Sequence, residues 1–134
     1  MKKDVNGFID TLKSIISDIP YSVHKEKISE GYFHTVFHAI MSVIGLRPIS
    51  EKETANGRID ERIELPSCIY IMEFKYSEDG KDLSDIALRQ IENKEYHQPD
   101  HLSGKEIIGI GLSYSQETRN INGKCNKTLF NLIL

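Results

Sequence analysis

The sequence predicts one α/β domain in which two helices precede a group of strands, and a third helix and further strands follow. In the first part of the chain, apolar residues recur at steps of three and four, as they do in amphipathic helices. The dipeptide Asn56-Gly57 lies between strand-like runs and is the strongest hairpin signal present. The chain has 134 residues, the length of one ordinary domain, so we expect residues 1–134 to share one core.

The two N-terminal helices have recognisable ends. The first is predicted over residues 4–19 and is expected to pack on the core, with Asp4 as its cap and Pro20 as its end. The second is predicted from about Lys25 to Ile44, where Gly45 gives a C-terminal stop. This second helix also carries polar residues near its apolar side, namely Glu30, His34 and His38.

Three extended runs follow the second helix. They are Pro48–Thr54, Arg58–Leu65 and Cys68–Lys75. If Pro66 and Ser67 form the loop between the last two runs, Asp60 lies directly opposite Glu73. Pro-Ser is not a favoured two-residue hairpin loop, so a longer or bulged turn that shifts the pairing stays open. Asp60 and Glu73 are nevertheless expected on one face of the sheet.

That face is predicted to hold a carboxylate pair between two cations. Strand alternation places Lys75 beside Glu73 and Arg58 opposite Lys75. Ile69 and Ile71 share the face, so other structure must cover part of it. Two half-buried carboxylates repel each other, and a divalent cation would relieve the repulsion, since Mg²⁺ sites commonly use one or two carboxylates. The alternative is that the charges form the solvated side of an edge strand.

A third helix is predicted from about Lys81 to Glu95. Its apolar stripe consists of Leu83, Ile86, Ala87 and Ile91. Gln90 falls on the same stripe, where a buried amide needs hydrogen-bond partners, and the proposed carboxylate face is the nearest sheet surface. The alternative is that Gln90 hydrogen-bonds the backbone at the margin of the stripe.

The rest of the chain closes the fold. The run GKEIIGIGLSY, which starts at Gly104, predicts a buried strand whose glycines allow close approach of a helix. His97 and His101 flank Pro99 in a polar loop and are expected to be solvated. The tail Asn120–Leu134 is ambiguous between a last strand, a short helix, and an apolar segment that meets a second copy in a homodimer.

Composition narrows the function classes. A net charge of −3 argues against a protein that holds nucleic acid by bulk electrostatics, although bound cations can supply local positive charge. The polar residues in the N-terminal run exclude a signal segment or membrane span, so we expect a cytoplasmic protein that makes no membrane contact. Cys68 and Cys125 are expected to be reduced. A zinc site at His34 and His38 is disfavoured because a third ligand is lacking, but His34 could face the carboxylates as an outer donor.

Five polar residues follow one another in a fixed order of predicted elements: Glu30 in SEGYFH on a helix, Asp60 in GRID, Glu73 and Lys75 in EFK after an apolar run, and Gln90 on the next helix. This combination resembles the PD-(D/E)XK nuclease superfamily. The closer likeness is to the branch found as the C-terminal domain of predicted AAA-ATPase-like bacterial proteins. It covers about Ile28 to Tyr114, which is most of the chain.

The resemblance implies a restriction-endonuclease-like fold, with a central mixed β-sheet flanked by helices and an α-β-β-β-α-β core. It implies Mg²⁺- or Mn²⁺-dependent hydrolysis of phosphodiester bonds in nucleic acid, with DNA favoured over RNA. Asp60 and Glu73 would hold the metal, and Lys75 would assist attack by water. Glu30 would add an outer carboxylate, and Gln90 would help to position the site.

Two features depart from that family. Glu61 and Arg62 follow Asp60 where a buried strand would continue with apolar residues, so we expect this strand to be more exposed or to lack a partner. The P-loop pattern GxxxxGK[ST] is absent from the sequence, so the chain either acts alone, is a fragment, or finds an ATPase partner in trans. A catalytically inactive nuclease-fold module that binds nucleic acid or a partner ATPase is therefore the alternative function.

Overall fold

The computed structural model describes residues 5–18, 30–43 and 45–131, and residues 30–32 by their backbone alone. The elements are α1 (Val5–Ser17), α2 (Glu30–Val43), β1 (Pro48–Thr54), β2 (Gly57–Glu64), β3 (Cys68–Ser77), α3 (Ser84–Asn93), the 3₁₀ helix η2 (Gln98–Ser103), β4 (Glu106–Ser115) and β5 (Asn120–Phe130). The predicted order of elements is confirmed, and the described part of the ambiguous tail is a strand.

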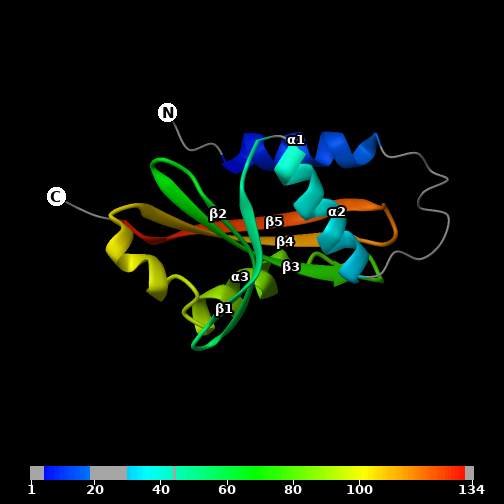
Figure 1. Cartoon of the computed structure of the whole chain (residues 1–134). Coiled ribbons are helices and arrows are strands. Elements are labelled where there is room, and N and C mark those ends of the chain that lie inside the picture. The colour runs from blue at the N-terminus through cyan, green and yellow to red at the C-terminus, as the bar shows by residue number, and fades with distance from the viewer. Residues whose placement is uncertain (1–4, 19–29, 44, 132–134) are drawn as a thin grey trace.

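The five strands form one mixed sheet in the order β1-β2-β3-β4-β5. Strands β3 and β4 run parallel, and the other neighbouring pairs are antiparallel. A parallel pair needs a crossover connection, which here contains α3. Helices α1 and α2 lie on one face of the sheet and α3 lies on the other (Figure 1). The predicted α/β fold with a central mixed sheet flanked by helices is therefore confirmed.

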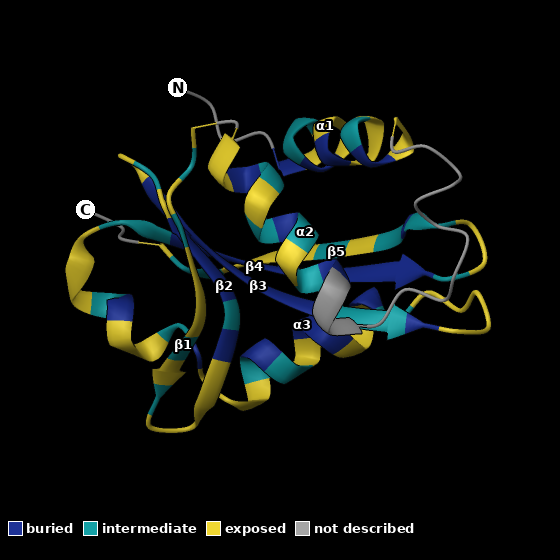
Figure 2. Ribbon diagram, turned by 45° about the vertical axis from the view of Figure 1, so that its right-hand side comes forward, coloured by how far each residue is buried: buried dark blue, intermediate teal, exposed yellow. Residues whose placement is uncertain are grey.

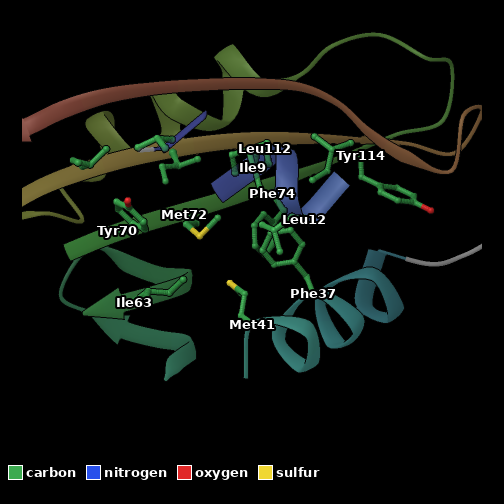
Figure 3. Close-up of a cluster of buried hydrophobic side chains, with 14 of the residues drawn as sticks. Ile9, Leu12, Phe37, Met41, Ile63, Tyr70, Met72, Phe74, Leu112 and Tyr114 are labelled. Carbon is green, nitrogen blue, oxygen red and sulfur yellow. The ribbon is translucent and has the colours of Figure 1, made fainter. Parts of the chain in front are cut away.

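The larger core lies between the sheet and the first two helices (Figure 3). Helix α1 contributes Ile9 and Leu12, and α2 contributes Phe37 and Met41. The sheet side of this core includes Ile63, Tyr70, Met72, Phe74, Ile110, Leu112 and Tyr114. These side chains alternate along β3 and β4, so the residues between them face α3.

Helix α3 approaches β4 very closely because two glycines lie beneath it. A Cβ atom on Gly111 would lie 2.2 Å from the Ser84 carbonyl oxygen and 2.6 Å from the Leu88 backbone nitrogen. The predicted role of these glycines is confirmed. The predicted apolar stripe is wrong in part, since Ile86 is 49% exposed and Ser84 and Leu88 are buried instead. Backbone contact with the glycines, rather than side-chain size, sets the rotation of the helix, whose buried and exposed sides are visible in Figure 2.

Strands β2 and β3 pair in the predicted register. The Leu65 amide donates to the Cys68 carbonyl across the two-residue loop at 2.8 Å, and pairing continues to Glu61 opposite Met72. The pairing ends there, and β2 continues along β1, where Arg58 pairs with Glu53. Neither Asp60 and Glu73 nor Arg58 and Lys75 are therefore paired directly opposite each other, and both predicted pairings are wrong. The Arg58 guanidinium instead lies 3.6 Å from the exposed carboxylate of Glu51.

The expectation that β2 is exposed after Asp60 is also wrong. Glu61 is 1% exposed and Arg62 is 8% exposed. The Glu61 carboxylate contacts His38 Nδ1 at 3.0 Å and accepts a hydrogen bond from Ser50. The Arg62 guanidinium donates two hydrogen bonds to Asp100, at 2.7 and 3.0 Å. Each buried charge has a specific partner, which is the usual condition for burying one.

The segment after α3 is more buried than the sequence suggests. His97 and His101 are half-buried, and the His101 ring stacks on Phe130 with ring centres 4.3 Å apart, so their predicted solvation is wrong. The two cysteines are free thiols, as predicted. Within the ranges that the structure describes, no helix has both the length and the apolar character needed to span a membrane.

Candidate active site

The candidate site lies where β2 and β3 stop pairing. Asp60 is the first β2 residue beyond the last paired position, and its Oδ2 atom accepts a hydrogen bond of 2.9 Å from the Phe74 backbone amide. The side chain thus takes the place of the missing backbone acceptor from β2. This contact fixes Asp60 beside the segment of β3 that carries Glu73 and Lys75.

Helix α3 supplies the group that joins Glu73 to Lys75. The Nε2 atom of Gln90 donates to Glu73 Oε2 at 2.6 Å, and Gln90 Oε1 accepts from Lys75 Nζ at 2.6 Å. Both β3 side chains point to the α3 face by strand alternation. The close approach of α3 over the β4 glycines brings Gln90 within reach of them. The structure thus brings together four of the five sequence-predicted site residues, counting Asp60.

Glu73 is electrostatically unusual. It is 4% exposed, and the pKa of its carboxyl is raised from 4.5 to about 8. Burial is the main cause of this rise and the nearby charge of Asp60 adds to it, while Lys75 opposes it. Oε1 of Glu73 is buried and has no hydrogen-bond partner. A buried carboxylate oxygen without a donor is strongly destabilised, so a positive ligand at this position would be favoured.

The donor set fits a divalent cation. Asp60 and Glu73 provide carboxylate oxygens, and the unpartnered Oε1 offers a free coordination position. No three His, Cys, Asp or Glu side chains of the described residues form a group that could hold a metal ion by themselves. Mg²⁺ commonly uses one or two carboxylates together with water and substrate phosphate oxygens, so two protein ligands are sufficient. Glu30 begins α2, but its side chain lies outside the described part of the chain.

Helix α2 approaches Asp60 through His34. His34 Nε2 lies 3.9 Å from Asp60 Oδ2, and this nitrogen is buried without a hydrogen-bond partner. His34 and Asp60 line an open pocket of about 330 Å³ together with Thr35, His38, Ser50 and Glu51. His38 has separate partners in Ser50 and Glu61. The two histidines therefore face different acids, His34 facing Asp60 and His38 facing Glu61.

Sequence reasoning missed Tyr96. Its side chain is buried, and a Cβ atom on Gly57 would lie 2.9 Å from its hydroxyl oxygen. Burial raises the pKa of Tyr96, a hydrogen bond with Gln90 lowers it, and the charges of Glu73 and Asp60 raise it. Tyr96 thus borders the site from beyond the end of α3. No periodic pattern marks it, because it follows the helix.

Comparisons with known proteins identify the family of this chain. A family model described as the PD-(D/E)XK nuclease superfamily matches residues 28–124, and the chain belongs to that superfamily. It is also similar to the "Uncharacterized protein in vnfD 5'region" of Azotobacter chroococcum mcd 1, with 26% identity over 126 residues. The match covers 92% of this chain and 24% of that relative, so the chain spans about a quarter of the relative's length.

The resemblance to the PD-(D/E)XK superfamily, which rests on five residues of the sequence, is confirmed. The ATPase context of the closer branch is not established by these comparisons. An ATPase partner in trans and a homodimer therefore remain predictions, as do a cytoplasmic location and the roles of the individual site residues.

Proposed function

We propose that this chain is a metal-dependent nuclease that hydrolyses phosphodiester bonds of nucleic acid, with DNA favoured over RNA. Membership of the nuclease superfamily supports a nucleic-acid substrate. The observation that carries the proposal is the buried and unpartnered Oε1 atom of Glu73, close to the Asp60 carboxylate and linked through Gln90 to Lys75. A cation-binding role explains why the carboxylates of Asp60 and Glu73 lie close together.

Asp60 and Glu73 are the proposed ligands of Mg²⁺ or Mn²⁺. When bound, the cation would lower the pKa of a coordinated water and polarise the phosphate. Asp60 is oriented by the Phe74 amide, and Glu73 is oriented by the Gln90 amide, so both carboxylates are held in place before a ligand arrives. Such preorganisation reduces the conformational entropy lost on binding.

Lys75 is the proposed cation that assists the attack by water. Gln90 Oε1 accepts one of its hydrogen bonds, and an ammonium group has three donors, so two remain for water or a phosphate oxygen. A fixed ammonium group stabilises the negative charge that develops on the phosphate in the transition state. Gln90 is therefore proposed as a positioning residue, and Glu30 as an outer carboxylate at the start of α2.

The alternative is an inactive module of the same fold that binds nucleic acid or a partner ATPase. In that case the buried Glu73 would bring a desolvation penalty without a compensating ligand. Replacing it with an apolar residue would then stabilise the domain at no loss of function. The retained Asp60, Glu73 and Lys75 set favours the active enzyme.

The test is a nuclease assay on single-stranded DNA, double-stranded DNA and RNA, with Mg²⁺ or Mn²⁺ and with EDTA. We expect cutting by the wild type in the presence of metal and loss of cutting in Glu73→Gln and Lys75→Ala. Glu117→Gln, which neutralises an exposed carboxylate in the turn after β4, is the matched control and should cut like the wild type. Absence of cutting by the wild type, or cutting that persists in EDTA or in Glu73→Gln, would favour the inactive module.

A further inference from the structure

A groove lies on the exposed side of α3, next to the candidate site. It has a volume of about 460 Å³, and its lining residues include Arg89, Gln90 and Lys94. Gln90 is half-buried, whereas Arg89 and Lys94 are exposed. The described residues that line the groove comprise two cations and no acid. The groove is therefore locally basic, although the chain as a whole carries a net charge of −3.

Gln90 joins this groove to the candidate site. Its side-chain amide donates to Glu73, its carbonyl oxygen accepts from Lys75, and the same residue forms part of the groove. Arg89 directly precedes Gln90, and Lys94 follows it by one helical turn. At 1.5 Å per residue, Arg89 and Lys94 are separated by about 7.5 Å along the helix axis. The two cations thus lie on either side of Gln90 along α3.

The acids near the groove leave its cations available. Asp85 contacts Arg89 at 3.0 Å, but the two side chains are 71% and 63% exposed. Exposed ion pairs of this kind are weak, and a phosphate can replace the carboxylate as the partner of a guanidinium group. Glu92 contacts Lys127 of β5 at 2.9 Å, and Glu95 does not line the groove. An anion in the groove would therefore meet two available cations.

We propose that this groove holds the nucleic-acid strand beside the scissile phosphate, with Arg89 and Lys94 contacting phosphates of its backbone. The inference rests on the proposed function and places the substrate of that site along α3. Two long cationic side chains at this separation can reach two phosphates of one strand. Contacts with phosphates fix the position of a strand but carry no sequence information, so the groove gives binding that depends on salt and not on sequence.

The competing explanation is a solvated helix face, on which Arg89 and Lys94 only offset the acids of α3. The two explanations differ in the salt dependence of binding. Each phosphate contact releases counterions, so a plot of the logarithm of the association constant against the logarithm of salt concentration becomes steeper with each contact. Cations on a merely solvated face add nothing to that slope.

The experiment measures binding of the whole chain to labelled single- and double-stranded DNA of two unrelated sequences. Fluorescence anisotropy is recorded over a series of salt concentrations in EDTA, which prevents metal-dependent cutting. The variants are Arg89→Gln, Lys94→Gln and the double variant. The matched control is Lys124→Gln, which removes one positive charge from an exposed residue of β5. Lys124 contacts Asn6 of α1, which lies on the opposite face of the sheet from α3 (Figure 1).

We expect each single substitution to reduce the magnitude of the slope by about one, and the double substitution to reduce it by about two. The loss of affinity should be the same for both sequences. Arg89→Lys keeps the positive charge and should keep the wild-type slope. Lys124→Gln should bind like the wild type.

A wild type that binds neither kind of DNA, a wild-type slope in the double variant, or an equal reduction in Lys124→Gln would overturn the proposal. A loss of affinity confined to one sequence would overturn it as well. Circular dichroism separates these outcomes from unfolding, and Arg89→Met and Lys94→Met serve if the glutamine variants do not fold.

The readout is independent of hydrolysis. A slope that depends on Arg89 and Lys94, in a protein that cuts nothing with Mg²⁺ or Mn²⁺, would overturn the proposed nuclease and leave this inference standing. Metal-dependent cutting by the wild type, together with an unchanged slope in the double variant, would do the reverse.

Discussion

The side-chain amide of Gln90 lies 2.6 Å from Oε2 of Glu73 and donates to it. The carbonyl oxygen of the same side chain accepts a hydrogen bond from Lys75. Removal of the Gln90 side chain therefore releases both Glu73 and Lys75. We expect Gln90→Ala to lower kcat by roughly ten- to a hundredfold with a smaller effect on KM. Steady-state kinetics measure both constants. Asn93→Ala, one turn further along α3 and exposed, is the control and should leave both unchanged. Equal effects of the two substitutions would contradict the positioning role.

Glu73 makes stability depend on pH in a defined direction. Its pKa is raised from 4.5 to about 8 in the folded state, so between these values the folded chain holds a proton that the unfolded chain releases. The free energy of unfolding should therefore fall as pH rises from about 4.5 to about 8, and this contribution should be constant above that range. Glu73→Gln removes the contribution and should be more stable than the wild type at pH above 8, by up to about 5 kcal/mol.

Urea unfolding in EDTA at several pH values measures this difference. The comparison of wild type with Glu73→Gln cancels the other titrating groups. If the two proteins lose stability in parallel as pH rises, Glu73 is not the group responsible.

Lys75 is expected to act on turnover and not on metal retention. Its ammonium group is bound to Gln90, and it is proposed to contact water and phosphate in the transition state. Lys75→Ala should lower kcat by roughly a hundred- to a thousandfold, the effect of removing one transition-state donor. Mn²⁺ affinity measured by calorimetry should stay near the wild-type value. Lys127→Ala removes an exposed lysine of β5 and serves as the control. Loss of Mn²⁺ binding in Lys75→Ala would assign the residue to the metal site instead.

The ion pair of Arg62 with Asp100 is expected to be important for stability. Both side chains are 9% exposed, and the two groups make two hydrogen bonds. Asp100→Ala leaves a buried guanidinium group without its main partner, which should lower the free energy of unfolding by about 3–5 kcal/mol. Asp85→Ala breaks an exposed ion pair with Arg89 at a similar distance and should change the free energy of unfolding by less than about 1 kcal/mol. Similar losses in the two variants, measured by urea unfolding, would refute this difference.

The two glycines of β4 should differ in their tolerance of a methyl group. Gly111 lies against backbone atoms of α3, so Gly111→Ala must displace the helix and should lower the free energy of unfolding by about 1–3 kcal/mol. The displacement would also move Gln90 away from Glu73 and reduce kcat. Gly109→Ala meets the flexible ends of Leu129 and Leu88 and should have a smaller effect on both. Thermal melts and kinetics of the two variants check the order, and a larger effect at Gly109 would contradict it.

The sequence predicts those parts of the site that depend on local geometry. A two-residue loop and strand alternation are sufficient to place Asp60 near Glu73, and helical spacing is sufficient to turn Gln90 toward them. The register of β2 and β3 follows from the same two facts.

Other features depend on contacts between distant parts of the chain. Arg58 lies away from Lys75 because β2 leaves β3 after Glu61 and follows β1, and alternation along a single strand does not reveal where pairing ends. The charge of Glu61 predicts exposure, but its partner His38, 23 positions away on another element, allows it to be buried. Tyr96 follows α3 and reaches the site through tertiary packing alone. Such contacts leave no periodic trace in the sequence.

The hydrogen bond from the Phe74 amide to Asp60 has a consequence for the study of relatives. Because the carboxylate completes the hydrogen bonding of β3, selection for folding alone would retain an acid at this position after catalysis was lost. An aspartate that aligns with Asp60 in a related chain is therefore weak support for activity. Glu73 differs, since its buried and unpartnered oxygen destabilises the fold in the absence of a ligand. If Glu73 holds a metal as proposed, a relative that does not bind metal should replace this glutamate first, and the residue aligned with Glu73 would be the better marker of activity.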